Sequence, residues 1–87
     1  MNIHCLVLIG RLKTKLKNHA PGYLFYAGGW LAGVYLNEVI VETEVELPIF
    51  PGEYGIIYLK PLSYQQGILK AHLIKFREID CGDISWP

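Results

Sequence analysis

The sequence has few of the residues that would indicate a metal site or a disulfide-stabilised secreted domain. Its 87 residues include two cysteines, Cys5 and Cys81, and three histidines, His4, His19 and His72. Two cysteines make no disulfide framework, so we expect reduced thiols and a cytoplasmic protein. No pair of these residues has the close, same-face spacing of a zinc site. We therefore expect no metal and no cofactor.

Nucleophiles and long hydrophobic runs are also scarce. The serine and threonine hydroxyls are those of Thr14, Thr43, Ser63 and Ser85. The sequence places no histidine or carboxylate beside any of them, and an active site needs such groups gathered together, so we expect no enzyme. The most apolar stretch, 23–36, contains three glycines and is shorter than a membrane-spanning helix. We expect no membrane insertion.

Acidic residues are missing from some segments and basic residues from others, although the formal net charge is zero. Residues 1–36 hold four basic and no acidic residues, and 37–53 hold five acidic and no basic residues. Residues 54–77 hold four basic and no acidic residues, and 78–87 hold three acidic and no basic residues. Local fields should therefore matter more to binding than the net charge.

A strand is predicted where the sequence reads "VLIGRLKTKLK", at 7–17. Leucines alternate there with four basic residues, Arg11, Lys13, Lys15 and Lys17. On a helix these four would divide between opposite sides, whereas on a strand they share one face. Gly10 should mark a bend or bulge, because a glycine inside a strand commonly sits at a barrel corner.

The half of this strand before Gly10 is apolar on both faces. Ile3, Cys5, Val7 and Ile9 occupy the face that later carries the lysines. In a small barrel one of the two faces points outward, so we expect a second subunit to cover it and the protein to be a homodimer. The alternative is that a loop or the C-terminal residues 84–87 fold over this face.

The remaining chain also reads as strands. We predict a second strand over 23–36, continuous or broken at Gly28 and Gly29, and a third over 38–48 with Glu42, Glu44 and Glu46 on one face. A fourth strand follows at 54–60, then a loop or hairpin tip at 61–67. Ser63 and Gln66 resemble a helix capping box, which would make the following segment, 68–79, a helix. The apolar residues of 68–79 scatter around a helical wheel, however, so we predict a strand with a bulge. Five strands indicate an all-β protein, a single domain over 1–87 that forms a small closed barrel with little or no helix.

Two segments resemble a known group of proteins. "LVLIGRL" at 6–12 resembles the opening strand of bacterial single-stranded DNA-binding proteins, and 54–83 resembles the last two strands of that group and of the primosomal replication protein of the N type. The resemblance covers about half of the chain and rests on the hydrophobic pattern, Gly10, Arg11, Gly67 and "ID-x-GD" at 79–83. It implies that the five strands form a small OB-like barrel (oligonucleotide-binding fold) that dimerises through its first strand. The chain departs from it between 46 and 54, where there is no room for a helix.

Barrels of this kind bind oligomers on strands two and three and on two flanking loops, here predicted at 17–22 and 61–67. Cationic side chains hold the phosphates of a single strand while aromatic rings stack on its bases. The sequence therefore predicts non-catalytic binding of single-stranded DNA or RNA. The candidate residues are Arg11, Lys13, Lys15, Lys17, Tyr23, Phe25, Tyr26, Trp30, Lys60, Tyr64 and Lys70.

A different function fits the same residues. A row of lysines is often a solvated face that prevents edge-to-edge aggregation, and aromatic residues near loops often pack at a rim. If the glutamate row faces the lysine row across an intervening strand, the long side chains would partly neutralise each other. A surface of mixed sign suits protein partners better than phosphates. The alternative is a small adaptor that binds another protein through its apolar first strand.

Overall fold

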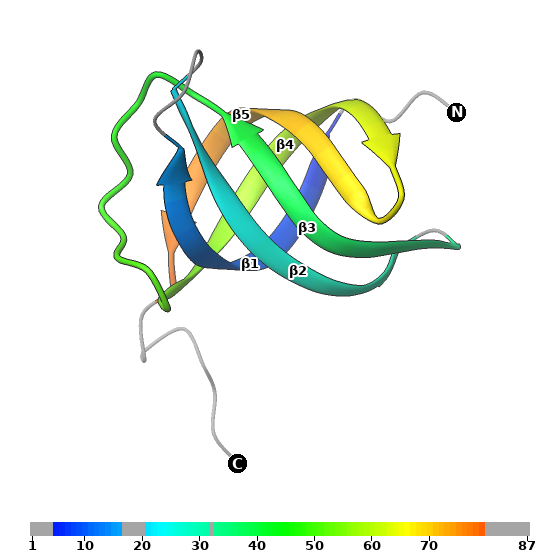
Figure 1. Cartoon of the computed structure of the whole chain (residues 1–87). Helices are drawn as coiled ribbons and strands as arrows, with labels where there is room; N and C mark the ends of the chain where they lie inside the picture. The colour runs from blue at the N-terminus through cyan, green and yellow to red at the C-terminus, as the bar shows by residue number, and fades with distance from the viewer. Residues whose placement is uncertain (1–4, 17–20, 32, 80–87) are drawn as a thin grey trace.

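The protein is an all-β barrel of five strands (Figure 1). The computed structural model describes residues 5–16, 21–31 and 33–79, and these contain no helix. No helix in this described part could cross a membrane. The strands are β1 (Leu6–Leu16), β2 (Gly22–Leu31), β3 (Val34–Glu42), β4 (Tyr54–Gln65) and β5 (Ile68–Glu78).

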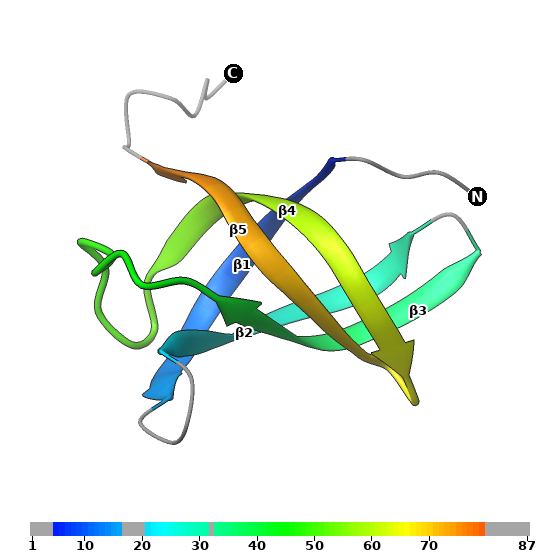
Figure 2. The ribbon, with the colours of Figure 1, turned by 90° about the horizontal axis from the view of Figure 1, so that it is seen from above.

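The strands close into a barrel in the order β1-β2-β3-β5-β4. β3 and β5 run parallel, and every other neighbouring pair is antiparallel. β1 closes the ring because its first half, Leu6–Arg11, pairs with β4, while its second half, from Arg11 onward, pairs with β2 (Figure 2). This order confirms the predicted OB-like barrel.

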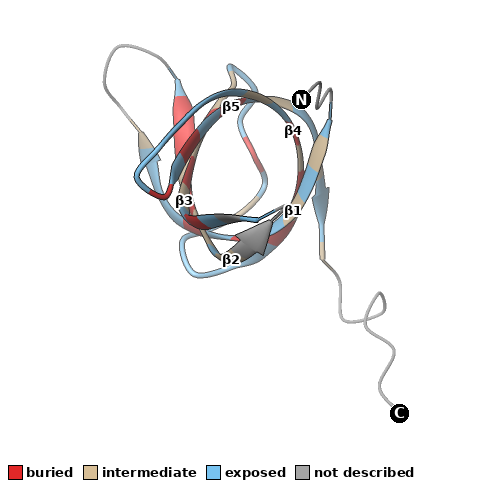
Figure 3. Cartoon of the chain, turned by 90° about the vertical axis from the view of Figure 1, so that its right-hand side faces the viewer, coloured by how far each residue is buried: buried red, intermediate tan, exposed pale blue. Residues whose placement is uncertain are grey.

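The core lies inside the barrel, and Figure 3 colours the buried positions red along the ring of strands. Its largest fully buried side chains are those of Phe25, Val39, Val41, Ile57 and Leu59. Each is apolar and takes part in the alternation that points every second residue inward. The inner faces of all the strands thus meet in one cluster.

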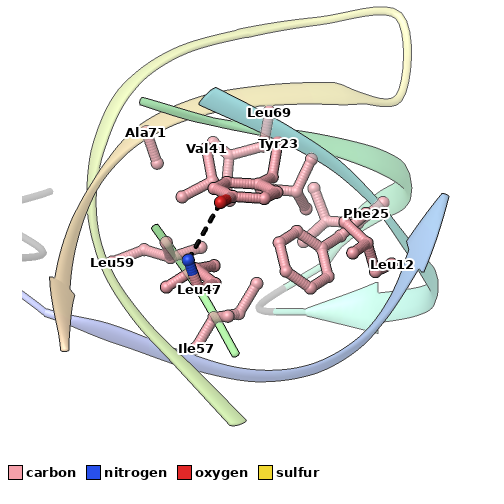
Figure 4. Close-up of a cluster of buried hydrophobic side chains, with 11 residues drawn as sticks. Leu12, Tyr23, Phe25, Val41, Leu47, Ile57, Leu59, Leu69 and Ala71 are labelled. Atoms are coloured by element: carbon pink, nitrogen blue, oxygen red, sulfur yellow. Dashed lines mark hydrogen bonds between the residues drawn. The ribbon is translucent and has the colours of Figure 1, made fainter. Parts of the chain in front are cut away.

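A loop, 43–53, closes one end of the barrel in place of a helix. Leu47 from this loop is buried in the core cluster, and its backbone N–H donates a 2.9 Å hydrogen bond to the Tyr23 hydroxyl (Figure 4). The absence of a helix between 46 and 54 was expected from the shortness of this segment. One leucine and one tyrosine hydroxyl hold the loop against the core.

Three predicted boundaries are wrong. The second strand does not run to residue 36, because the chain turns between Leu31 and Val34 and returns as β3. Gly33 has φ +80°, a conformation that glycine adopts without strain, so the turn forms there. At Gly28 and Gly29 the predicted break is a register shift between β2 and β3.

The third strand ends at Glu42 and not at 48, so Glu44 and Glu46 lie in the loop and form no acidic strand face. β4 extends through 61–65, which we predicted as loop, and the chain turns only at Gln66 and Gly67. The strand predicted over 68–79 is β5, and its predicted bulge is present at Ile74, where the pairing with β4 shifts.

Candidate nucleic-acid interface

A bulge in β1 divides the predicted basic row. The pairing of β1 with β2 shifts between Leu12 and Thr14, which leaves Lys13 as the extra residue. Before the shift Arg11 lies opposite Tyr26, and after it Lys15 lies opposite Tyr23. Tyr26 and Tyr23 are three residues apart on β2 and so point to opposite faces. The prediction that all the basic residues share one face is therefore wrong, since an inserted residue reverses the alternation.

Arg11 and Lys13 gather around one tyrosine on the outer surface. The Arg11 guanidinium carbon lies 5.0 Å and the Lys13 Nζ 5.2 Å from the centre of the Tyr26 ring. The Tyr26 hydroxyl, as a hydrogen-bond partner, raises the pKa of Lys13 above its usual value, with a smaller contribution from Glu38. Both neighbours therefore favour the charged form of Lys13.

Arg11 also has an aromatic neighbour on its other side. It pairs with Tyr54 at the start of β4, and Tyr54 is 57% exposed. Residues directly opposite on antiparallel strands place their side chains on the same face. Tyr26, Arg11 and Tyr54 therefore form a row across β2, β1 and β4, with Lys13 beside it. We call these four residues the Arg11 row.

Glutamates lie beside three of the predicted lysines. Lys13 Nζ is 3.8 Å from Glu38 across β2, Lys15 Nζ is 3.6 Å from Glu46 in the loop, and Lys70 Nζ is 3.1 Å from Glu42. His72 Nδ1 lies 3.4 Å from the same Glu42. The sequence left two possibilities for the lysines: free to bind phosphates, or partly neutralised by glutamates. Exposed ion pairs of this kind contribute little to stability, so a polyanion could replace the glutamates at small cost.

Tyr23 and Phe25 do not belong to the exposed surface. Tyr23 is 3% exposed and Phe25 is completely buried. Both side chains lie on the inner face of β2. The sequence shows that aromatic residues follow the first loop, but it does not show which of them face the core. Neither ring can stack on a base in this structure, so we remove both from the candidate site.

The second predicted loop is a short turn held against β3. The Tyr64 hydroxyl donates a 2.7 Å hydrogen bond to the Tyr35 carbonyl, and the Asn37 N–H donates one of 2.7 Å to the Gly67 carbonyl. Tyr64 remains partly exposed at this turn. Lys60 lies away from the turn, opposite His72 on β5.

Some predicted residues cannot be placed. Ile3, Lys17 and the side chain of Trp30 lie outside the described part of the chain. Val7 and Ile9 of the predicted dimer interface are 50% and 63% exposed, and Cys5 is exposed. A single chain does not test the homodimer, which stays a prediction.

Tyr54 is a site residue that the sequence did not reveal. It lies 43 positions after Arg11 in the chain, and only the pairing of β1 with β4 brings the two together.

Within 5–16, 21–31 and 33–79, no group of three His, Cys, Asp or Glu residues could hold a metal ion. No family model, curated protein or solved structure matches the chain.

Proposed function

We propose that this protein binds single-stranded nucleic acid, without catalysis, through the Arg11 row. The observation that carries the proposal is the position of Arg11 between two tyrosines on the outer face of an OB-like barrel. Among the described residues no carboxylate lies within ion-pair distance of Arg11. Barrels of this architecture bind oligonucleotides around strands two and three, and the Arg11 row adjoins that face through Tyr26 on β2.

The Arg11 row can supply both kinds of contact that a single strand requires. Arg11 and Lys13 would hold phosphates, and the exposed Tyr54 ring would stack on a base whatever its identity. Each stacked base contributes about 1 to 3 kcal/mol. Lys70 and Tyr64 could extend the contact toward the turn between β4 and β5. We place this activity in the cytoplasm, where free thiols stay reduced.

The test is fluorescence anisotropy with an end-labelled oligothymidine at low salt. The double variant R11Q/K13Q should bind at least about tenfold more weakly, because two charge-assisted contacts are lost. The matched control is Lys15→Gln, since the bulge places Lys15 away from the Arg11 row. If R11Q/K13Q binds as K15Q does, or if the unaltered protein shows no binding, the proposal is wrong.

The homodimer is part of this proposal. The exposed Val7 and Ile9 lie opposite Tyr58 and Ile56 of β4, so an apolar strip covers the outer face of β1 and β4. A second copy of the chain would remove this strip from water. Sedimentation should show a dimer that Ile9→Lys converts to a monomer. A monomer at all concentrations would favour the adaptor function, in which the strip binds a different protein.

A further inference from the structure

The second half of β5 has an open edge. β3 pairs with β5 only over Glu38–Glu42 and Ile68–His72, and then leaves the sheet as the loop 43–53. From Leu73 to Glu78, β5 pairs with β4 alone, and in the described ranges no other backbone hydrogen bond reaches these residues. A strand edge of this kind presents a row of unpaired N–H and C=O groups, which can pair with another chain.

A groove runs along this edge. Residues 73–78 line one side of it, and Val45, Leu47 and Pro48 of the loop line the other. Val45 is 64% and Ile74 55% exposed, whereas Leu73 and Phe76 are half-buried against the core. The groove therefore offers apolar side chains next to unpaired backbone.

Two cationic residues that line this groove, Lys75 and Arg77, have no carboxylate partner among the described residues. Lys75 and Arg77 lie opposite Tyr58 and Ile56 of β4, and Lys75 Nζ is 5.7 Å from the centre of the Tyr58 ring. None of the ion pairs of the described residues includes Lys75 or Arg77. The groove also contains Glu78, at the end of the strand. Lys75 and Arg77 are two residues apart and so share one face of β5.

We propose that the β5 edge at 73–78 binds an extended acidic segment of another protein, which adds a strand to the barrel. Alternate side chains of an added strand point to opposite faces, so carboxylates at every second position would meet Lys75 and Arg77. The apolar side chains between them would enter the groove beside Phe76 and Leu47. Backbone hydrogen bonds provide affinity in this mode, and the alternate side chains provide specificity.

Charge and backbone chemistry favour an acidic peptide segment over a second copy of the chain and over a nucleic acid. A second copy joined edge to edge at β5 would oppose Lys75 and Arg77 with their own counterparts, and like charges directly opposite are destabilising. A nucleic acid has no peptide N–H and C=O groups to pair with a strand edge, and the aliphatic side chains of Ile74 and Val45 offer no ring for a base to stack on.

The probe is a labelled nine-residue peptide in which glutamate and valine alternate, measured by anisotropy. All the N–H groups that face β5 belong to alternate residues. N-methylation of either the glutamates or the valines should therefore abolish binding, while N-methylation of the other set should leave it. This comparison uses the unaltered protein, so it does not depend on how a variant folds. Absence of binding by the unmethylated peptide, or equal binding by both methylated peptides, would overturn the proposal.

Two matched charge reversals separate this site from the Arg11 row. K75E/R77E should weaken peptide binding at least tenfold and weaken oligothymidine binding much less, through the altered field alone. R11E/K13E should have the reverse effect. If K75E/R77E binds the peptide as the unaltered protein does, the β5 edge is not its site.

Hydrogen exchange locates the occupied edge directly. The peptide should slow exchange at amides within 73–78. Protection only at residues 6–10 would overturn the proposal. Protection of 73–78 by oligothymidine, or by concentrated protein without peptide, would equally overturn it, since the occupant would then be a nucleic acid or a second copy.

Discussion

At the scale of single residues, Tyr23 joins the barrel core to the loop that closes its end. Its ring packs beside Phe25, with the ring centres 6.5 Å apart, and its hydroxyl accepts the Leu47 N–H. Leu47 is buried, so its N–H would otherwise lack a partner away from water. One hydroxyl therefore allows a polar backbone group to enter an apolar interior.

Tyr23→Phe should destabilise the fold by about 1 to 3 kcal/mol, because the buried Leu47 N–H loses its acceptor while the ring remains. Urea unfolding measures this difference. Tyr58→Phe is the control, since no hydrogen bond of the Tyr58 hydroxyl occurs among the described residues. Equal stability of the two variants would show that the Tyr23 hydroxyl does not support the loop.

At the scale of the strands, β1 and β4 pack closely where two glycines face each other. Gly10 lies opposite Gly55. A Cβ at Gly10 would lie 3.0 Å from the Phe25 ring, and one at Gly55 would overlap the Phe76 ring. The absence of both side chains lets two phenylalanines fill the barrel close to where the pairing of β1 passes from β4 to β2.

Gly55→Ala should lower stability by about 1 to 3 kcal/mol, and by more than Gly10→Ala, because the added methyl overlaps a packed ring. Gly28→Ala is the matched control, since a Cβ there meets no atom within 4 Å and the residue lies on the same sheet. Thermal unfolding compares the three. A G55A melting temperature equal to that of G28A would mean that Phe76 moves aside without cost.

At the scale of the whole molecule, the zero net charge conceals an uneven surface. Glutamates neutralise Lys13, Lys15 and Lys70, whereas Arg11, Lys60, Lys75 and Arg77 have no ion-pair partner among the residues that the structure describes. The unpaired cations all lie on β1, β4 and the second half of β5. Their field can attract an anionic partner to this side of the barrel although the chain as a whole is neutral.

The affinity for oligothymidine should fall with added salt, because each neutralised phosphate releases counterions. Contacts from Arg11, Lys13 and Lys70 predict a slope of log affinity against log salt of about −2, at about −0.7 for each phosphate of a single strand. R11Q/K13Q should flatten this slope to about −0.7. Anisotropy at several salt concentrations measures both slopes. An affinity that does not depend on salt would contradict phosphate binding.

The sequence predicted the barrel well and the site only in part. Local alternation around Gly10 and over 54–60 identified strands correctly, because the period of a strand is visible within a few residues. It failed at Lys13, where one extra residue turned Lys15 to the other face. It also failed for Tyr23 and Phe25, whose burial depends on which face of β2 closes on the core.

By itself, the sequence determined the class of fold and the segregation of charge along the chain, since composition and periodicity are local properties. The irregularity of β1 that the sequence predicted at Gly10 lies at Lys13 instead, since the pairing with β4 is regular through Gly10. Only the tertiary structure decided which charges meet and which edges stay open. Lys13 meets Glu38 across β2, Arg11 pairs with Tyr54 of β4, and β3 leaves β5 at Glu42. These contacts depend on register between distant strands, which a single bulge changes by one residue.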